Sequence, residues 1–198
     1  MALPLLAMAA ALVAPGFAGA DADALNRAFA EGRVYAPVAA VVTLDVAPDG
    51  TIIACQMGQA EGDKSSLRRI CPVLEKQRLS RTASADGQAQ FGRVVAVVSI
   101  KETGDDAHPL MQVGENPEMQ LKVNQLPKDA GSTLKVNLTL QVSAEGNAVA
   151  CESEDHVPQP FVNAACRSLA SQPGVANADG NPVPYVTSAA VRFVTQGG

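Results

Sequence analysis

The chain has 198 residues, of which 47% are hydrophobic, so its length and composition suit a folded protein that buries a core. Its formal net charge is −5, and the 20 acidic and 15 basic residues are spread along the chain. This balance disfavours nucleic acid and anionic membrane surfaces as partners. Because only 4% of the residues are aromatic and Trp is absent, we expect aliphatic side chains to fill the core.

The N-terminal residues 1–20 have the pattern of a signal peptide. They carry no charged side chain, residues 3–13 are mostly apolar, and small residues precede the polar stretch that begins at Asp21. We therefore expect cleavage after Ala20 and a periplasmic mature protein that does not insert into a membrane. The alternative is an uncleaved membrane anchor, but the apolar stretch is shorter than the roughly 20 residues that span a bilayer.

An internal repeat organises the rest of the chain, with landmarks that recur after about 95 residues. Each copy has an apolar run, a turn glycine, two cysteines, an Ala-x-Ala-Asp-Gly string and a final apolar run. The first copy has residues 38–46, Gly50, Cys55, Cys71, residues 83–87 and residues 94–100; the second has residues 134–142, Gly146, Cys151, Cys166, residues 176–180 and residues 189–194.

The second copy shows its expected secondary structure most clearly. Apolar and polar residues alternate over 134–142, which predicts a strand with one buried face, and Gly146 allows the turn into a second strand that carries Val149 and Cys151 on one face. Pro160 suits a helix start, and a helix with one apolar face follows it. A last strand over 189–194 completes a β-β-α-β unit.

The predicted fold class is therefore α+β, with two tandem β-β-α-β units, each a small antiparallel sheet with one helix packed on it. We expect the first unit in residues 21–100, a linker in residues 101–132 that is rich in Gly, Pro, Asp and Asn, and the second unit in residues 133–198. In the first unit Pro72 interrupts a helical stripe, which requires a kink or a helix that begins there.

The four cysteines are predicted to form two disulfides, Cys55 with Cys71 and Cys151 with Cys166. In each unit one cysteine lies on the buried face of a strand and the other on the apolar face of the helix that packs there. On the chain-entropy model, closing each loop with a disulfide stabilises the folded state by roughly 3 kcal/mol. Export would place the chain in an oxidising environment, where disulfides persist. A zinc site is disfavoured because the sequence has neither a Cys-x-x-Cys pair nor suitably spaced histidines.

No catalytic motif stands out, so we expect a protein that is not an enzyme and uses no cofactor. His108 and His156 lie outside any known motif, and an active site would have to be assembled between the units from residues without a local signature. Glu152, Glu154 and Asp155 precede His156 and could bind a cation, but a solvated acidic loop is the simpler interpretation.

The landmarks resemble the C-terminal domain of TonB-type energy transducers, especially variants that carry a cysteine pair. The resemblance covers residues 34–100 and 133–194 and rests on the turn glycines, the four cysteines and the two Ala-Asp-Gly strings. It implies a periplasmic domain that binds a short peptide segment of an outer-membrane receptor by adding it as a strand to a sheet edge.

By this analogy we expect a non-catalytic module that binds a protein or peptide partner of the cell envelope through edge-strand addition. The strands 93–100 and 187–194 are the candidate edges, because they contain no proline and few charges. The alternative function is a TonB-type energy transducer for outer-membrane transport that keeps its N-terminal segment as a membrane anchor. The candidate binding residues are Arg93, Val95, Val97, Ser188, Ala190 and Arg192.

Overall fold

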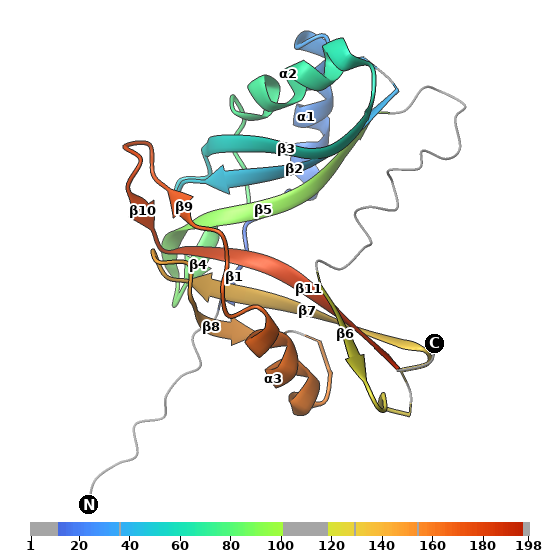
Figure 1. Cartoon of the computed structure of the whole chain (residues 1–198). Coiled ribbons are helices and arrows are strands. Elements are labelled where there is room, and N and C mark those ends of the chain that lie inside the picture. Colours follow the sequence, from blue (N-terminus) through green and yellow to red (C-terminus); the bar gives the residue numbers. More distant parts are fainter. Residues whose placement is uncertain (1–11, 36, 101–118, 129, 154, 196–198) are drawn as a thin grey trace, which may run out of the picture.

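The chain folds around one continuous mixed β-sheet (Figure 1). The computed structural model describes residues 12–35, 37–100, 119–128, 130–153 and 155–195. Within these ranges nine strands form the main sheet, two short strands form a separate hairpin, and three helices accompany them.

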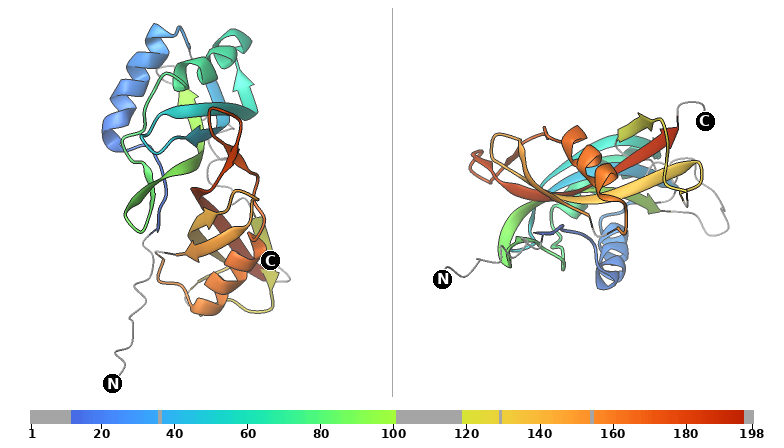
Figure 2. Two further views of the ribbon diagram at one scale, coloured as in Figure 1. Left: turned by 90° about the vertical axis from the view of Figure 1, so that its left-hand side faces the viewer. Right: turned by 90° about the horizontal axis from the view of Figure 1, so that it is seen from below.

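The main sheet consists of β1 (Leu12–Val13), β2 (Val38–Val46), β3 (Ile52–Gly62), β4 (Ala83–Ala85), β5 (Gln88–Ile100), β6 (Met119–Val123), β7 (Thr133–Val142), β8 (Ala148–Glu152) and β11 (Tyr185–Thr195). The separate hairpin is β9 (Val175–Ala176) with β10 (Pro182–Val183), and the helices are α1 (Gly19–Glu31), α2 (Lys64–Leu74) and α3 (Gln159–Ser168). Seen from below in Figure 2, α1 and α3 lie on opposite sides of the sheet.

The predicted fold class, two separate β-β-α-β units with small sheets of their own, is wrong. β5 pairs in parallel with β11, with Phe91 opposite Tyr185 and Arg93 opposite Thr187, so strands from both halves belong to one mostly β structure. The physical reason is the length of β5, which begins at Gln88, well before the expected strand. Its first residues extend past the partner strand β2 and reach the second half.

A tight turn explains why β5 begins so early. Asp86 and Gly87 both have positive φ values, 53° and 73°, which is the conformation of a two-residue hairpin of type I′. The Asp-Gly of the repeated string therefore joins β4 to β5, and their pairing starts directly at Ala85 and Gln88. In the first half the string therefore marks a hairpin of the main sheet.

Both halves contain the same bulged hairpin. The pairing of β2 with β3 skips Ile53, and the pairing of β7 with β8 skips Val149, in each case two residues before the first cysteine. An extra residue in one strand turns its neighbours relative to the partner strand. This corrects the expectation that Val149 shares the buried face of Cys151, because the Val149 side chain is 62% exposed.

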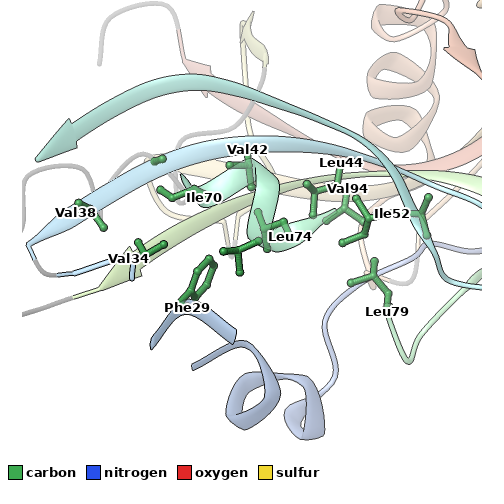
Figure 3. Close-up of a cluster of buried hydrophobic side chains, with 13 residues drawn as sticks. Phe29, Val34, Val38, Val42, Leu44, Ile52, Ile70, Leu74, Leu79 and Val94 are labelled. Atoms are coloured by element: carbon green, nitrogen blue, oxygen red, sulfur yellow. The ribbon is translucent and has the colours of Figure 1, made fainter. Parts of the chain in front are cut away.

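Two large clusters of aliphatic side chains form the core. The first lies between the sheet and the helices α1 and α2, where Phe29 of α1 points toward Leu74 of α2 (Figure 3). The second lies between α3 and the strands β7 and β11, and Phe161 meets Phe193 edge to face at 5.1 Å between ring centroids. The expected alternation in β7 is confirmed, since Val136, Leu138, Leu140 and Val142 are all buried.

The helix and linker of the first half differ from the expectations in detail. α2 runs through Pro72, which sits in its last turn, so the alternative in which the helix begins at this proline is wrong. The Pro72 ring is exposed, while Ile70 and Leu74 of the same helix are buried in the core. β6 lies within the expected linker and pairs in parallel with β11; residues 101–118 lie outside the described part.

The segment 12–31, which contains the expected cleavage site, is packed into the fold. β1 pairs antiparallel with β4, and α1 begins at Gly19, so a cut after Ala20 would fall inside this helix. Among the described residues no helix combines the length and the apolar character needed to cross a membrane.

Candidate functional site

The predicted disulfides are confirmed in both halves. Cys55 is bonded to Cys71 and Cys151 to Cys166, with Cα atoms 5.4 and 5.9 Å apart. Each bridge joins the second strand of a hairpin to the helix that packs on it, as the face assignment predicts. Such bonds indicate folding in an oxidising environment outside the cytosol.

The six candidate binding residues lie on two neighbouring strands, and among the described residues β5 has the longer stretch without a partner strand on one side. β11 pairs with β7 along Tyr185–Val194 on one side, and with β5 and β6 on the other. Arg192 therefore lies opposite residues of both neighbouring strands, and Ser188 and Ala190 fall in the short stretch between β5 and β6. The expected edge position is wrong for most of β11, since β6 was not recognised as a strand.

On β5, the stretch from Val94 to Ile100 pairs with β2 on one side. On its other side the pairing with β11 stops at Arg93, and no further partner strand occurs among the described residues. The two strands diverge after this point, as Figure 1 shows. Val95 and Val97 therefore belong to an edge whose backbone groups lack a described strand partner.

The backbone groups that point to this edge follow from one hydrogen bond. The Thr187 hydroxyl of β11 donates to the carbonyl of Arg93 at 3.0 Å, so this carbonyl faces away from β2. Residues two apart in a strand direct their N–H and C=O groups to the same side. Val95, Val97 and Ser99 thus offer their N–H and C=O groups to the open edge.

An apolar groove of about 430 Å³ follows the same edge. It is lined by five consecutive residues of β5, 96–100. Because the side chains of consecutive strand residues point to opposite faces of the sheet, a groove that contacts all five residues must run along the edge of the strand. The Ser99 hydroxyl is buried and has no hydrogen-bond partner in the described structure. The lining residues are Phe17, Ala18, Leu25, Asn26, Phe29, Leu74, Ala96, Val97, Val98, Ser99 and Ile100, none of which is charged.

Three of the candidate residues, Arg93, Val95 and Ser188, meet instead at a polar cavity of about 350 Å³ between the two halves. Arg93 does not offer a free charge there. It donates from Nε and a terminal nitrogen to both carboxylate oxygens of Asp45, at 2.7 and 2.9 Å, and the two side chains are only 11% and 10% exposed.

The same guanidinium connects the halves. It donates to the carbonyls of Pro173 and Gly174 at 2.9 and 3.0 Å, and it lies 5.4 Å from the centroid of the Tyr185 ring. Burial alone would lower the pKa of Arg93, but its hydrogen bonds and ion pair with Asp45 raise that pKa above its usual value. Arg93 is therefore a charged structural link, and the expectation that it marks an open edge is wrong.

The acidic stretch before α3 does not gather into a cation site. Glu152 accepts a hydrogen bond from the backbone of Leu12, whereas Asp155 accepts one from the backbone of Asn137. Glu154 and His108 lie outside the described residues, and His156 is exposed. In the described ranges no group of three or more acidic, histidine or cysteine side chains is placed to hold a metal ion.

Sequence reasoning missed the helix side of the groove. Leu25 and Phe29 are one helical turn apart in α1, and this spacing is the signal that would have predicted an amphipathic helix. Because residues 1–20 were assigned to a signal peptide, the start of this helix was excluded and its apolar face was not recognised.

Comparison with known proteins adds no family to this description. No protein-family model, no curated protein and no solved structure matches the chain. The resemblance to TonB C-terminal domains therefore stands on the quoted landmarks alone.

Proposed function

We propose that the protein is an exported, non-catalytic binding module of the periplasm that captures an extended peptide at the open edge of β5. The observation that carries the proposal is the coincidence of that edge with the uncharged groove beside α1. An added strand satisfies the free N–H and C=O groups, and its side chains enter the groove. The TonB-like landmarks favour the same mode of binding.

The second half supports this mechanism by example. There β6 occupies the edge of β11 that corresponds to the open edge of β5, and it pairs in parallel over Val191–Thr195. Met119, Leu121 and Val123 of β6 pack against the core, and the residues between them are polar. A peptide that alternates apolar and polar residues in this way is the class of ligand we propose for β5.

Amide hydrogen exchange tests the edge directly on the full chain. In the free protein, the amides of Val95, Val97 and Ser99 should exchange faster than those of Ala96 and Val98, which face β2. A peptide with the β6 sequence, Met-Gln-Leu-Lys-Val with blocked ends, should then slow exchange at the three outward amides. Equal protection of all five amides in the free protein, unchanged by the peptide, would contradict the proposal.

Two substitutions at one position separate the backbone from the side chain. Val97→Pro removes an outward N–H without removing a donor to β2, so peptide binding measured by fluorescence anisotropy should weaken at least tenfold. Val97→Ala keeps the N–H and should retain most of the affinity. If Val97→Pro does not fold, Asn26→Trp, which fills the groove from the exposed face of α1, should also weaken binding; unchanged affinity there refutes the groove.

A further inference from the structure

The polar cavity between the two halves, with a volume of about 350 Å³, has a floor made by one row of side chains. Thr43 of β2 lies opposite Gln56 of β3 and opposite Val95 of β5, and directly paired residues share one face of a sheet. Val42 and Leu44, on either side of Thr43, are buried in the first core. The row therefore lies on the face of the sheet that is turned away from α1 and α2.

The second half provides the opposite wall of this cavity. The loop 172–174 lines it together with Thr187 and Ser188 of β11. The backbone N–H and the side-chain amide of Gln172 donate to carbonyls of the second half at 2.8 and 3.0 Å. From the first half, Arg93 donates to the two loop carbonyls described above. The protein's own hydrogen bonds therefore hold both walls in place.

The described lining of the cavity offers no uncompensated charge to a ligand. Arg93 is the one charged side chain among the described residues that line it, and Asp45 neutralises this charge through both carboxylate oxygens. A charged ligand would give up part of its hydration here without gaining an unpaired partner of opposite charge, which is unfavourable. The lining therefore favours an uncharged molecule.

The polar groups of the lining suit a molecule with many hydroxyls. Thr43, Gln56 and Ser188 contribute two hydroxyls and an amide, and each of these groups can both donate and accept hydrogen bonds. None of the three side chains has a hydrogen-bond partner in the part of the chain that the structure describes. The Val95 side chain, which is 47% exposed, adds an apolar surface beside them. A sugar ring combines hydroxyls on its rim with C–H groups on its faces, and the cavity volume lies at the small end of the range of ligand pockets.

We propose that this cavity is a binding site for one uncharged monosaccharide. The hydroxyls of the sugar bond to Thr43, Gln56 and Ser188, and a C–H face of its ring packs on Val95. The cavity and the groove beside α1 share no lining residue, and Val95 takes part in the proposed peptide edge only through its backbone N–H and C=O groups. The sugar site therefore adds a second ligand to the proposed peptide-binding function, and the two sites depend on different side chains.

A titration of the full chain with matched sugars tests the proposal. Glucose and galactose are each compared with their uronate and their amino sugar, which keep the ring and add a negative or a positive charge, at a mildly acidic pH where the amino sugars are protonated. Binding is measured by ligand-observed saturation-transfer NMR. We expect at least one neutral sugar to bind roughly tenfold or more tightly than both of its charged analogues. No saturable binding of either neutral sugar, or equal binding of neutral and charged sugars, would overturn the proposal.

Substitutions of exposed residues on β3 locate the bound sugar. Gln56→Ala should weaken sugar binding about fivefold or more, whereas the matched Gln59→Ala, outside the cavity on the same strand, should leave it unchanged. Gln56→Lys adds a positive charge to the lining and should reverse the preference in favour of the uronate. Asn26→Trp in the groove should not affect sugar binding, and Gln56→Ala should not affect peptide binding, so failure of one site is distinguished from failure of the other. Wild-type affinity in Gln56→Ala, or a Gln56→Lys variant that still prefers the neutral sugar, would refute this cavity as the sugar site.

Discussion

The strongest prediction of the structure concerns the buried ion pair of Asp45 and Arg93. Replacing Asp45 with Ala removes the acceptors of two N–H groups of the Arg93 guanidinium. The Arg93 side chain is only 11% exposed, so water replaces these acceptors poorly. Removal of one partner from a buried pair typically costs 3–5 kcal/mol. Because the site retains some contact with solvent, we expect a loss of about 3 kcal/mol in the free energy of unfolding.

Urea denaturation followed by far-UV circular dichroism, with both disulfides intact, measures this loss. Arg78→Ala is the control, since its ion pair with Asp49 has side chains that are 65% and 55% exposed, and its cost should be much smaller because solvent screens the pair. The double variant Asp45→Ala with Arg93→Met should cost clearly less than the sum of its two single variants. The reasoning is wrong if Asp45→Ala is no more destabilising than Arg78→Ala.

Three further predictions test other parts of the fold. Replacing Cys151 and Cys166 together with Ala should destabilise the protein by about 3 kcal/mol in urea, the loss expected from the entropy of the reopened loop. Gly146→Ala combines a φ of +86° with a Cβ only 2.5 Å from a carbonyl oxygen, so it should lower the free energy of unfolding by about 2 kcal/mol or more. Gly180→Ala has a similar φ of +81° but open space around the Cβ, so it should lower that free energy by about 1 kcal/mol. Hydrogen bonds from two neighbouring serines lower the pKa of Asp63 below 3.8. The ionised Asp63 therefore stabilises the folded protein at pH values above 3.8, and this stabilisation is lost as the pH falls through the lower pKa that Asp63 has in the folded state. The Asp63→Asn variant lacks this contribution, so its thermal stability should drop less between about pH 6 and pH 2.

The local features that depend on short-range patterns were predictable from the sequence. Alternation in residues 134–142 predicted β7, and the spacing from each turn glycine predicted both disulfides. These features are determined within one hairpin and the helix that packs on it. Val149 was misplaced because a bulge shifts the alternation by one residue and leaves no mark in composition.

The joining of the halves was not predictable in this way. It depends on a pairing between Phe91 and Tyr185, and nothing in either local pattern indicates which distant strand will lie beside it. The candidate edge on β5 was found, but the edge on β11 was not free because β6 is a short strand within a polar segment. The groove was not predicted because α1 forms one side of it, and the first turn of α1 overlaps the residues that were assigned to the end of a signal peptide.

The junction between β5 and β11 joins equivalent strands of the two halves. In each half the last strand pairs on one side with the first strand of its own hairpin, β2 or β7, and turns the other side toward the opposite half. Contacts between equivalent edges are isologous, so they close after two copies and do not extend into a fibre. The two halves therefore meet within one polypeptide as the two subunits of a closed homodimer would. A symmetric dimer would bring two arginines to the same axis, whereas here Arg93 lies opposite Thr187.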